Sequence, residues 1–159
     1  GVKLRFCEFP IFENSMLAGL KHLNRIDSVM ARSEWEEDEF FDGVMLDNSE
    51  SIIDGTMTNL FFSKNNVLYT PIIKKSGING IMRQVVIDNA KLFFKEVCEI
   101  EIKRKTISTF DEMFVTNSVI KILPVTHLSN KKFRTTNATR EMINFFFKKS
   151  KRSKNLELV

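Results

Sequence analysis

The stretch Leu17-Ala18-Gly19-Leu20-Lys21-His22-Leu23-Asn24-Arg25-Ile26-Asp27-Ser28-Val29-Met30 decides how the rest of the chain is interpreted. An extended segment that reaches Lys21 precedes a predicted helix, which we expect to begin near Asn24 and to run towards Glu39. Within this helix, apolar residues recur at spacings of three and four, which predicts one stripe packed against a core: Ile26, Val29 and Met30.

Lys21 lies where the extended segment gives way to the helix, so its amine can point into a cleft instead of into water. A lysine does covalent chemistry only when it is neutral, and its pKa of about 10.4 must be lowered by burial or nearby cations. The commonest reason to hold a lysine in this way is a covalent bond to an aldehyde cofactor. An ordinary lysine on a solvated face is the alternative.

The composition is that of one domain with a sizeable core. The chain has 159 residues, of which 43% are hydrophobic, and this is enough to bury such a core. Cys7 and Cys98 show no pairing pattern, which predicts a reduced, cytoplasmic protein. The sequence shows no signal-peptide pattern and no apolar run of about 18 residues, so we expect no membrane partner.

The net charge is +4, and the basic excess gathers near the C-terminus, at positions 148–154. We interpret residues 148–159 as a solvated basic tail. The alternative is a nucleic-acid-binding patch, which predicts salt-sensitive binding that is lost when residues 148–154 are removed. No RNA-binding signature or finger spacing accompanies the patch, so we expect no nucleic-acid partner.

The first half of the chain predicts a strand over residues 2–9, a loop from Pro10 to Met16 that continues to Lys21, and then the helix. The outer face of this predicted helix is acidic. We expect its carboxylates to be solvated and not to bind a metal, because no His or Cys accompanies them. They belong to Glu34, Glu36, Glu37 and Asp38. Short strands follow, arranged as an antiparallel meander that ends at Pro71: residues 43–47, 51–54, 59–62 and 67–70.

The second half predicts further helices and strands. A helix from Ile81 to about Val97 has an apolar side made by Ile81, Val85, Phe93 and Phe94. The elements after it are a strand, a short helix capped by Ser108 or Thr109, two more strands, and a last helix that starts at Thr136 or Asn137: residues 98–103, 108–112, 113–116, 119–125 and 136–147. This mixture predicts an α+β domain whose mixed, mostly antiparallel sheet or barrel is covered by helices.

A second motif is Asp54-Gly55-Thr56-Met57-Thr58-Asn59-Leu60-Phe61. An acid at the end of a strand, beside glycine and hydroxyl residues such as Thr58, can face a cofactor. A pyridine ring acts as an electron sink only when its nitrogen is protonated, and a carboxylate held against that nitrogen favours the protonated form. An Asp-Gly turn is the structural alternative.

The third motif is Gly77-Ile78-Asn79-Gly80-Ile81-Met82-Arg83-Gln84. Glycines before a helix let backbone N–H groups approach an anion, and the helix dipole favours negative charge there, so a phosphate is the expected ligand. A plain loop is the alternative. Arg83 is either a structural cation or a neighbour of the phosphate.

The fourth motif, Asp111-Glu112-Met113-Phe114-Val115-Thr116-Asn117-Ser118, places polar residues between two apolar strands. These polar groups can bind a phosphate through hydrogen bonds, and an ordinary turn is the alternative. Arg25 follows Lys21 by four residues and can approach the same ligand. We interpret His22 and His127 as hydrogen-bonded structural histidines.

Taken together, these motifs resemble those of the fold-type IV pyridoxal-phosphate enzymes, and within them the aminodeoxychorismate lyase group. The motifs occur in the family's order, and the resemblance extends from about Val2 to Phe147. It implies the fold of the large C-terminal domain of these enzymes, a mixed, mostly antiparallel barrel-like sheet with flanking helices. It also implies pyridoxal 5'-phosphate as the cofactor.

The resemblance implies a role for each candidate residue. Lys21 is the catalytic residue and forms the covalent bond to the cofactor. The family has a glutamate where this chain has Asp54, which is one methylene shorter, so the backbone must bring its carboxylate closer to the ring nitrogen. The amides of Ile81 and Met82 hold the phosphate. The complete set of implied cofactor-binding residues is Lys21, Arg25, Asp54, Thr58, Ile81, Met82, Asn117 and Ser118.

The implied reaction converts 4-amino-4-deoxychorismate to 4-aminobenzoate and pyruvate in folate biosynthesis. The nearest alternative is an aminotransferase of the same fold that acts on D-amino or branched-chain amino acids. The two share the cofactor residues, so Lys21 cannot separate them, whereas Gly-Ile-Met-Arg-Gln and Lys-His-Leu-Asn-Arg favour the lyase.

We expect residues 1–147 to form the pyridoxal-phosphate-binding C-terminal domain. In the family, a smaller N-terminal domain precedes this region and supplies an arginine to the phosphate. We expect this smaller domain to be missing here and the chain alone to bind the cofactor poorly. The resemblance also implies a homodimer with its sites near the interface.

Overall fold

The computed structural model describes the backbone of residues 1–36 and 38–154 and the side chains of residues 1–36 and 38–147. The helices are α1 (Ile26–Arg32), α2 (Ile81–Asn89) and α3 (Asn137–Lys154). Short 3₁₀ turns cover Ala90–Leu92 and Arg104–Thr109. The strands are β1 (Val2–Phe6), β2 (Asp42–Leu46), β3 (Ser51–Gly55), β4 (Asn59–Lys64), β5 (Val67–Pro71), β6 (Glu96–Ile100), β7 (Ile102–Lys103), β8 (Glu112–Asn117), β9 (Lys121–Leu128) and β10 (Lys131–Lys132).

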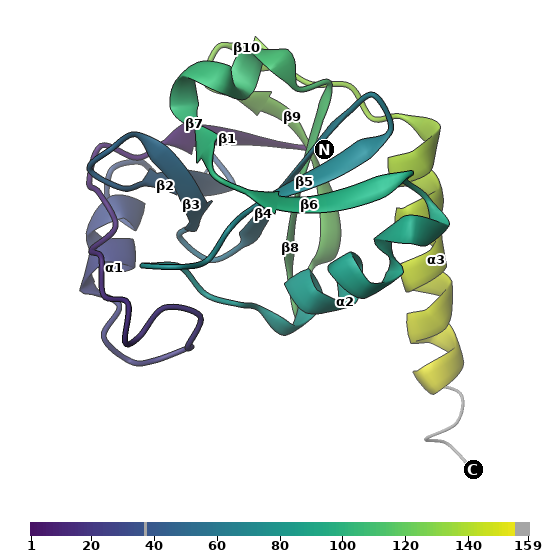
Figure 1. The fold of residues 1–159 in the computed structure, drawn as a ribbon, viewed down its shortest axis with the longest axis horizontal. Helices are drawn as coiled ribbons and strands as arrows, with labels where there is room; N and C mark the ends of the chain where they lie inside the picture. Colours follow the sequence, from purple (N-terminus) through teal and green to yellow (C-terminus); the bar gives the residue numbers. More distant parts are fainter. Residues whose placement is uncertain (37, 155–159) are drawn as a thin grey trace.

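The described strands form one mixed sheet in the order β6-β5-β4-β8-β9-β1-β2-β3-β7, with β10 paired to β9 (Figure 1). β1 pairs in parallel with both β2 and β9, and β5 pairs in parallel with β6. The pairs β2–β3, β3–β7, β4–β5, β4–β8 and β8–β9 are antiparallel. Only Glu101 separates β6 from β7 in the chain, so the two ends of the sheet lie next to each other. The predicted α+β fold with a mostly antiparallel, barrel-like sheet is confirmed.

The central strands are buried on both faces. On β4, Leu60 and Phe62 belong to the cluster inside the curled sheet, whereas Phe61 belongs to the cluster beneath α2 and α3. Phe61 stacks on Phe114 of β8, with ring centroids 5.0 Å apart and planes 10° apart. A strand that is covered on both sides needs apolar residues at successive positions, which explains the continuous apolar runs in this part of the sequence.

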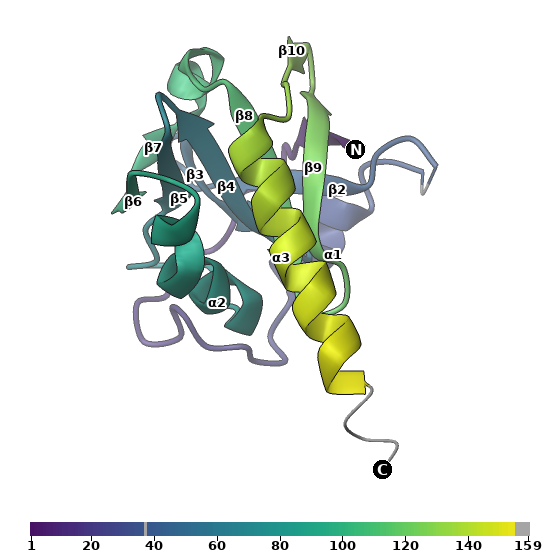
Figure 2. The same ribbon diagram turned by 90° about the vertical axis from the view of Figure 1, so that its right-hand side faces the viewer.

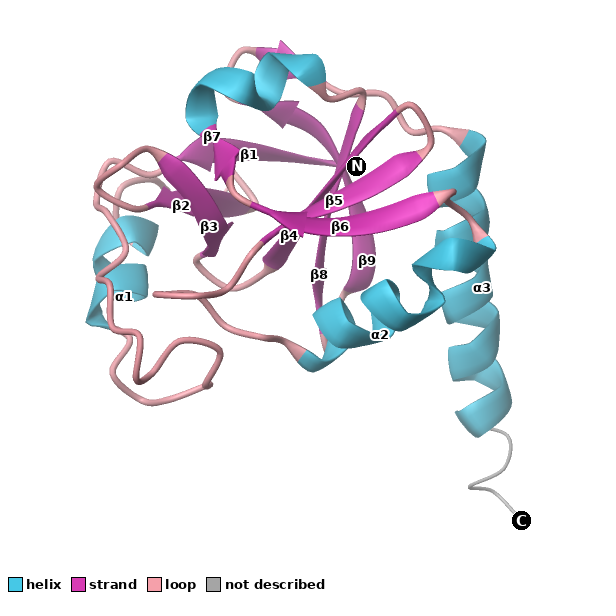
Figure 3. Cartoon of the chain, viewed as in Figure 1, coloured by secondary structure: helices cyan, strands magenta, loops and turns pink. Residues whose placement is uncertain are grey.

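The helices cover the sheet from outside (Figure 2, Figure 3). α2 packs on β8, α3 packs on β9, and α1 packs on β2. The last helix begins at Asn137 as predicted, and its Met142 and Phe146 side chains are buried. The basic side chains at positions 148–159 lie outside the described residues. None of the described helices has the length and apolar character of a membrane span.

The predicted extent and orientation of the first helix are wrong. α1 ends at Arg32 instead of continuing towards Glu39. Its predicted stripe is exposed, because Ile26, Val29 and Met30 keep 53%, 60% and 44% of their surface. The buried side chains are Asp27, Ser28 and Ala31, and Ala31 packs with Trp35 and Met45. The spacing of the apolar residues is helical, but they lie on the face that points away from this domain.

The second helix is also shorter than predicted. α2 ends at Asn89, and residues 96–97 already belong to β6, which pairs with β5 from Val67↔Glu96 onwards. The buried face of the helix is made by Met82, Val86 and the adjacent Ala90, whereas Ile81 is 76% exposed. Phe93 and Phe94 follow the 3₁₀ turn and are not on the helix.

Other predicted elements differ because the sheet pairs residues that are distant in sequence. The predicted strand 98–103 divides at Glu101, since β6 pairs with β5 and β7 pairs with β3. The predicted meander is two hairpins, β2–β3 and β4–β5, which lie in different parts of the sheet. Residues 111–112 are not helical. Glu112 starts β8, and its buried carboxylate accepts hydrogen bonds from Ser63 and Thr136.

The acidic segment after α1 is not solvated throughout. The Glu34 carboxylate accepts the backbone N–H groups of Glu8 and Phe9 and lies 3.4 Å from the Arg5 guanidinium. It therefore links the segment after α1 to the end of β1. Glu37 lies outside the described residues.

Candidate active site

The loop that carries Lys21 is tied to the loop before α2. The backbone N–H of Gly19 donates to the carbonyl of Gly77 at 2.9 Å, and the N–H of Asn79 donates to the carbonyl of Gly19 at 3.1 Å. Gly19 and Gly77 have φ values of +84° and +90°, which favour glycine. These two bonds place Lys21 beside the N-terminus of α2, although the two segments are about sixty residues apart in sequence.

A cavity of about 450 Å³ opens beside these loops. It lies between the lysine loop, the turn after β3, the N-terminus of α2 and the turn after β8. All eight predicted cofactor-binding residues line it: Lys21, Arg25, Asp54, Thr58, Ile81, Met82, Asn117 and Ser118. The structure therefore brings together the four sequence motifs, and it places Lys21 on the same side of the domain as Asp54.

Asp54 lies at the end of β3 with 2% of its surface exposed. Its Oδ2 accepts the backbone N–H of Ile78 at 3.0 Å, whereas its Oδ1 has no hydrogen-bond partner among the described residues. Burial raises the pKa of Asp54 to about 7, although the Ile78 N–H and the charge of Arg25 act in the opposite direction. An unpartnered buried oxygen in a cavity wall is suited to accept a hydrogen bond from a ligand.

The N-terminus of α2 presents unpaired backbone donors to the cavity. Gly80 precedes the helix, and its carbonyl accepts the N–H of Gln84 as the first intrahelical bond, at 3.1 Å. The N–H groups of Ile81 and Met82 therefore have no acceptor within the helix. A Cβ at Gly80 would overlap Oδ1 of Asn59, so a larger residue there would have to displace the Asn59 side chain. Donors at a helix N-terminus can hold a phosphate.

Arg83 does not line the cavity. Its buried guanidinium donates to the Pro71 carbonyl at 3.0 Å, to Glu99 at 2.5 Å and to Asn79 at 3.0 Å. It therefore connects α2 to β5 and β6, which is the structural role considered from the sequence.

The remaining wall is held by side-chain to backbone hydrogen bonds. Arg25 donates to the Thr56 carbonyl at 3.3 Å, and Asn117 donates to the Met57 carbonyl at 3.3 Å. The Thr58 hydroxyl donates to Asp42 at 2.6 Å, so only its lone pairs are left for a ligand. Lys21 is exposed at the cavity, next to these groups.

Two side chains that support this wall were not predicted from the sequence. Asn59 donates to the Ile78 carbonyl at 2.7 Å and lines the cavity; it lies inside the quoted 54–61 motif, which was the available signal. Asp42 is fully buried and holds the turn after β3. An aspartate before a strand looks like an ordinary turn residue, so no sequence signal distinguished it.

The two histidines differ. His127 lies 3.1 Å from the Thr126 hydroxyl, in agreement with a hydrogen-bonded structural role. Nδ1 of His22 is buried without a partner among the described residues, so the same prediction is wrong for that atom. No cluster of three or more His, Cys, Asp or Glu side chains suited to a metal occurs in the described part of the chain.

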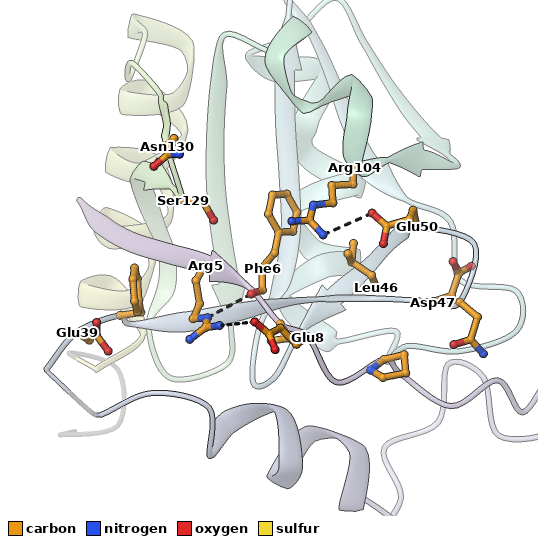
Figure 4. Close-up of a pocket in the computed structure, with 14 residues that line it drawn as sticks. Arg5, Phe6, Glu8, Glu39, Leu46, Asp47, Glu50, Arg104, Ser129 and Asn130 are labelled. Carbon is orange, nitrogen blue, oxygen red and sulfur yellow. Dashed lines mark hydrogen bonds and ion pairs between the residues drawn. The ribbon is translucent and has the colours of Figure 1, made fainter.

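A larger cavity, of about 840 Å³, lies elsewhere, between β1, β2 and the turn after β9 (Figure 4). Its arginines are already paired: Arg5 with Glu34 and Glu8, and Arg104 with Glu50 at 3.5 Å. None of the eight predicted residues lines it. We therefore place the candidate site in the smaller cavity, where Oδ1 of Asp54 is buried and has no hydrogen-bond partner among the described residues.

Residues 6–128 match the model of the family described as amino-transferase class IV. The chain belongs to this family. Aminodeoxychorismate lyase of Vibrio harveyi is 34% identical over 129 residues, which are 81% of this chain and 48% of that protein. A putative branched-chain-amino-acid aminotransferase of Methanocaldococcus jannaschii is 34% identical over 70% of this chain and 39% of its own length.

Solved structures of the class IV family share the fold. The crystal structure of 4-amino-4-deoxychorismate lyase from Pseudomonas aeruginosa has a TM-score of 0.86 and 32% identity, over 91% of this chain and 53% of that one. The branched-chain amino acid aminotransferase of Escherichia coli has a TM-score of 0.80 over 92% of this chain and 50% of its own; at 24% identity this shows the fold alone. The chain spans about half the length of the curated relatives it matches.

Proposed function

We propose that this chain is the cofactor-lysine domain of a pyridoxal-phosphate-dependent aminodeoxychorismate lyase, which converts 4-amino-4-deoxychorismate to 4-aminobenzoate and pyruvate. The observation that carries the proposal is that Lys21, Asp54 and the N-terminus of α2 line one cavity. The named lyase relatives and the Gly-Ile-Met-Arg-Gln and Lys-His-Leu-Asn-Arg motifs support a lyase.

The residues of the cavity fit pyridoxal phosphate. Oδ1 of Asp54 is buried, accepts no hydrogen bond within the described chain and can accept the N–H of a protonated pyridine ring. The free N–H groups of Ile81 and Met82 suit the phosphate. The amine of Lys21 suits the aldehyde. The ring nitrogen, the phosphate and the aldehyde of this ligand thus each have a matching group in the wall.

When bound, pyridoxal phosphate supplies an electron sink for the electrons of a broken bond. Lys21 is the proposed point of covalent attachment and, once its amine is free, the base that takes the proton from the substrate carbon next to the nitrogen. Asp54 keeps a proton at the ring nitrogen, because a carboxylate beside that nitrogen favours its charged form. Arg25 places a positive charge at the cavity for the ligand or for a substrate carboxylate.

The test is to mix the 159-residue chain with pyridoxal phosphate, record the visible absorbance and reduce with borohydride. The proposal predicts a reduced adduct on the peptide that contains Lys21, identified by mass spectrometry. Lys21→Ala should abolish the adduct. Lys91→Ala should leave it unchanged, because Lys91 is an exposed lysine away from the cavity. An adduct that survives in Lys21→Ala would contradict the assignment.

A class IV aminotransferase acting on D-amino or branched-chain amino acids is the second candidate. Branched-chain-amino-acid aminotransferase relatives at 33% to 36% identity favour it. The cofactor residues do not discriminate between the two, so the reaction itself must be assayed. Release of pyruvate from 4-amino-4-deoxychorismate supports the lyase, and transfer of an amino group to a keto acid supports the aminotransferase.

We also propose that a second copy of the chain is a partner. Large apolar side chains are exposed throughout one segment, the lysine loop and α1: Phe12, Met16, Leu20, Leu23, Ile26, Val29 and Met30. An exposed apolar surface of this extent is typical of a protein interface.

A further inference from the structure

Asp42 is a buried carboxylate on β2, just behind the wall of the candidate cavity. Its Oδ1 accepts the Thr56 hydroxyl at 2.6 Å, the Thr56 N–H at 3.1 Å and the Gly43 N–H at 2.8 Å. Its Oδ2 accepts the Thr58 hydroxyl at 2.6 Å. Both oxygens of Asp42 are therefore bound to the turn that joins β3 to β4.

The β3–β4 turn accepts hydrogen bonds from two residues that line the cavity, Arg25 and Asn117. The carbonyl of Thr56 accepts a hydrogen bond from Arg25, and the carbonyl of Met57 accepts one from Asn117. Arg25 comes from the start of α1 and Asn117 from the end of β8, so the turn is where three separate segments meet. A displacement of this turn would move the hydrogen-bond acceptors of both side chains.

The contact between Asp42 and the turn is close. A Cβ at Gly55 would overlap Oδ2 of Asp42 and Oγ1 of Thr58, so only glycine fits between them. Burial raises the pKa of Asp42, while its hydrogen bonds from Thr56, Thr58 and Gly43 lower it. A buried carboxyl group is costly unless its hydrogen bonds are made, which indicates that these bonds are important for the turn.

We propose that Asp42 is a positioning residue of the candidate site: by fixing the Thr56–Thr58 turn, it sets the positions of Arg25 and Asn117 at the cavity. The choice of pyridoxal phosphate as the ligand rests on the proposed function. Asp42 itself does not touch the ligand, because it is absent from the cavity lining of the described chain.

The chain offers a matched control in Glu112. This carboxylate is also buried, with 3% of its surface exposed, and it accepts hydroxyl hydrogen bonds from Ser63 at 2.6 Å and Thr136 at 2.7 Å. It links β8 to β4 and to the start of α3 and does not line the cavity. Loss of either carboxylate removes comparable hydrogen bonds, but only loss of Asp42 affects the wall of the site.

The experiment compares Asp42→Ala with Glu112→Ala in the 159-residue chain. Both variants should unfold at lower urea concentration than the unaltered chain. In a titration with pyridoxal phosphate followed by absorbance, only Asp42→Ala should bind more weakly, by roughly tenfold, because a misplaced turn disturbs the geometry of the site. Asp42→Asn should bind within about threefold of the unaltered chain, because an amide can accept from Thr56 and Gly43 and donate to Thr58.

A second measurement needs no ligand. The side-chain amide signals of Asn117 in ¹H–¹⁵N spectra should shift in Asp42→Ala and not in Glu112→Ala, because only the first variant removes the carboxylate that holds the turn bearing the Met57 carbonyl. If Asp42→Ala does not fold, Thr56→Val and Ser63→Ala replace the pair, since each removes one hydroxyl donor from one of the two carboxylates.

Equal affinity for pyridoxal phosphate in Asp42→Ala and the unaltered chain, or an equal loss in Glu112→Ala, would overturn the proposal. If the unaltered chain forms no Lys21-dependent adduct, the proposed function fails instead. In that case the Asn117 signals still decide on the role of Asp42: unshifted signals in the Asp42 variant refute it, and shifted signals support it.

Discussion

At the scale of single residues, Asp54 links the candidate site to the stability of the fold. Its pKa is about 7 in the folded chain, against 3.8 for an ordinary aspartate, mainly because burial disfavours the charged form. Between about pH 4 and pH 7 the folded state keeps a proton that the unfolded state has lost. The free energy of unfolding therefore decreases as the pH rises through this range, by up to about 4 kcal/mol.

Asp54→Asn should remove this dependence, because an amide does not titrate. Urea unfolding at pH 5 and pH 8 measures it: the stability of the variant relative to the unaltered chain should be higher at pH 8 than at pH 5. Asp111→Asn is the control, since it makes the same chemical change at an exposed side chain. Parallel pH profiles for Asp54→Asn and the unaltered chain would contradict the assigned cause.

The eight site residues could be predicted because each lies in one of four motifs that together resemble one enzyme family, whereas each motif alone left a structural alternative open. Asp42 could not, because its role depends on a contact with Thr56 and Thr58, fourteen and sixteen residues away. Asn59 lay within a recognised motif, but its bond to Ile78 also needs the folded structure.

At the scale of elements, the stack between β4 and β8 is the clearest target. Phe61→Ala removes a fully buried ring from between these strands and the helices that cover them. We expect a loss of about 3–5 kcal/mol in the free energy of unfolding, from lost transfer energy and the cavity left behind. Phe12→Ala, at an exposed ring, should cost far less in the same urea titration. Equal losses in the free energy of unfolding for Phe61→Ala and Phe12→Ala would contradict the assigned role of Phe61 in the cluster beneath α2 and α3.

The elements with a strong local pattern were predicted well, whereas their ends and faces were not. The spacing of Ile26, Val29 and Met30 indicates a helix, but it cannot show which side of that helix the domain covers. The residues around Glu101 have one alternating pattern, and only the partners of β6 and β7 divide it into two strands. The position of Glu112 in a strand also could not be predicted locally, because its carboxylate accepts hydrogen bonds from Ser63 on β4 and from Thr136 just before α3.

At the scale of the whole molecule, the exposed stripe of α1 provides a test of self-association. Ile26→Gln combined with Val29→Gln should convert a dimer to a monomer in sedimentation velocity, because both side chains are exposed in the single chain. The free energy of unfolding of the monomer should change by no more than about 0.5 kcal/mol.

Leu92→Gln is the matched control for this experiment. Leu92 is 66% exposed and lies on the 3₁₀ turn after α2, outside the lysine loop and α1. It should leave the dimer intact. An unaltered chain that sediments as a monomer, or a double variant that remains a dimer, would refute the proposed interface.

The position of β1 in the middle of the sheet has a consequence for biosynthesis. β1 is made before β9, yet the two are neighbours in the sheet, with Val2 paired to Val125. During translation the hydrogen-bonding edge of β1 on that side stays unpaired until β9 has left the ribosome, and an open strand edge invites aggregation. Nascent chains stalled before residue 121 should therefore depend on chaperones more than chains that extend beyond residue 128.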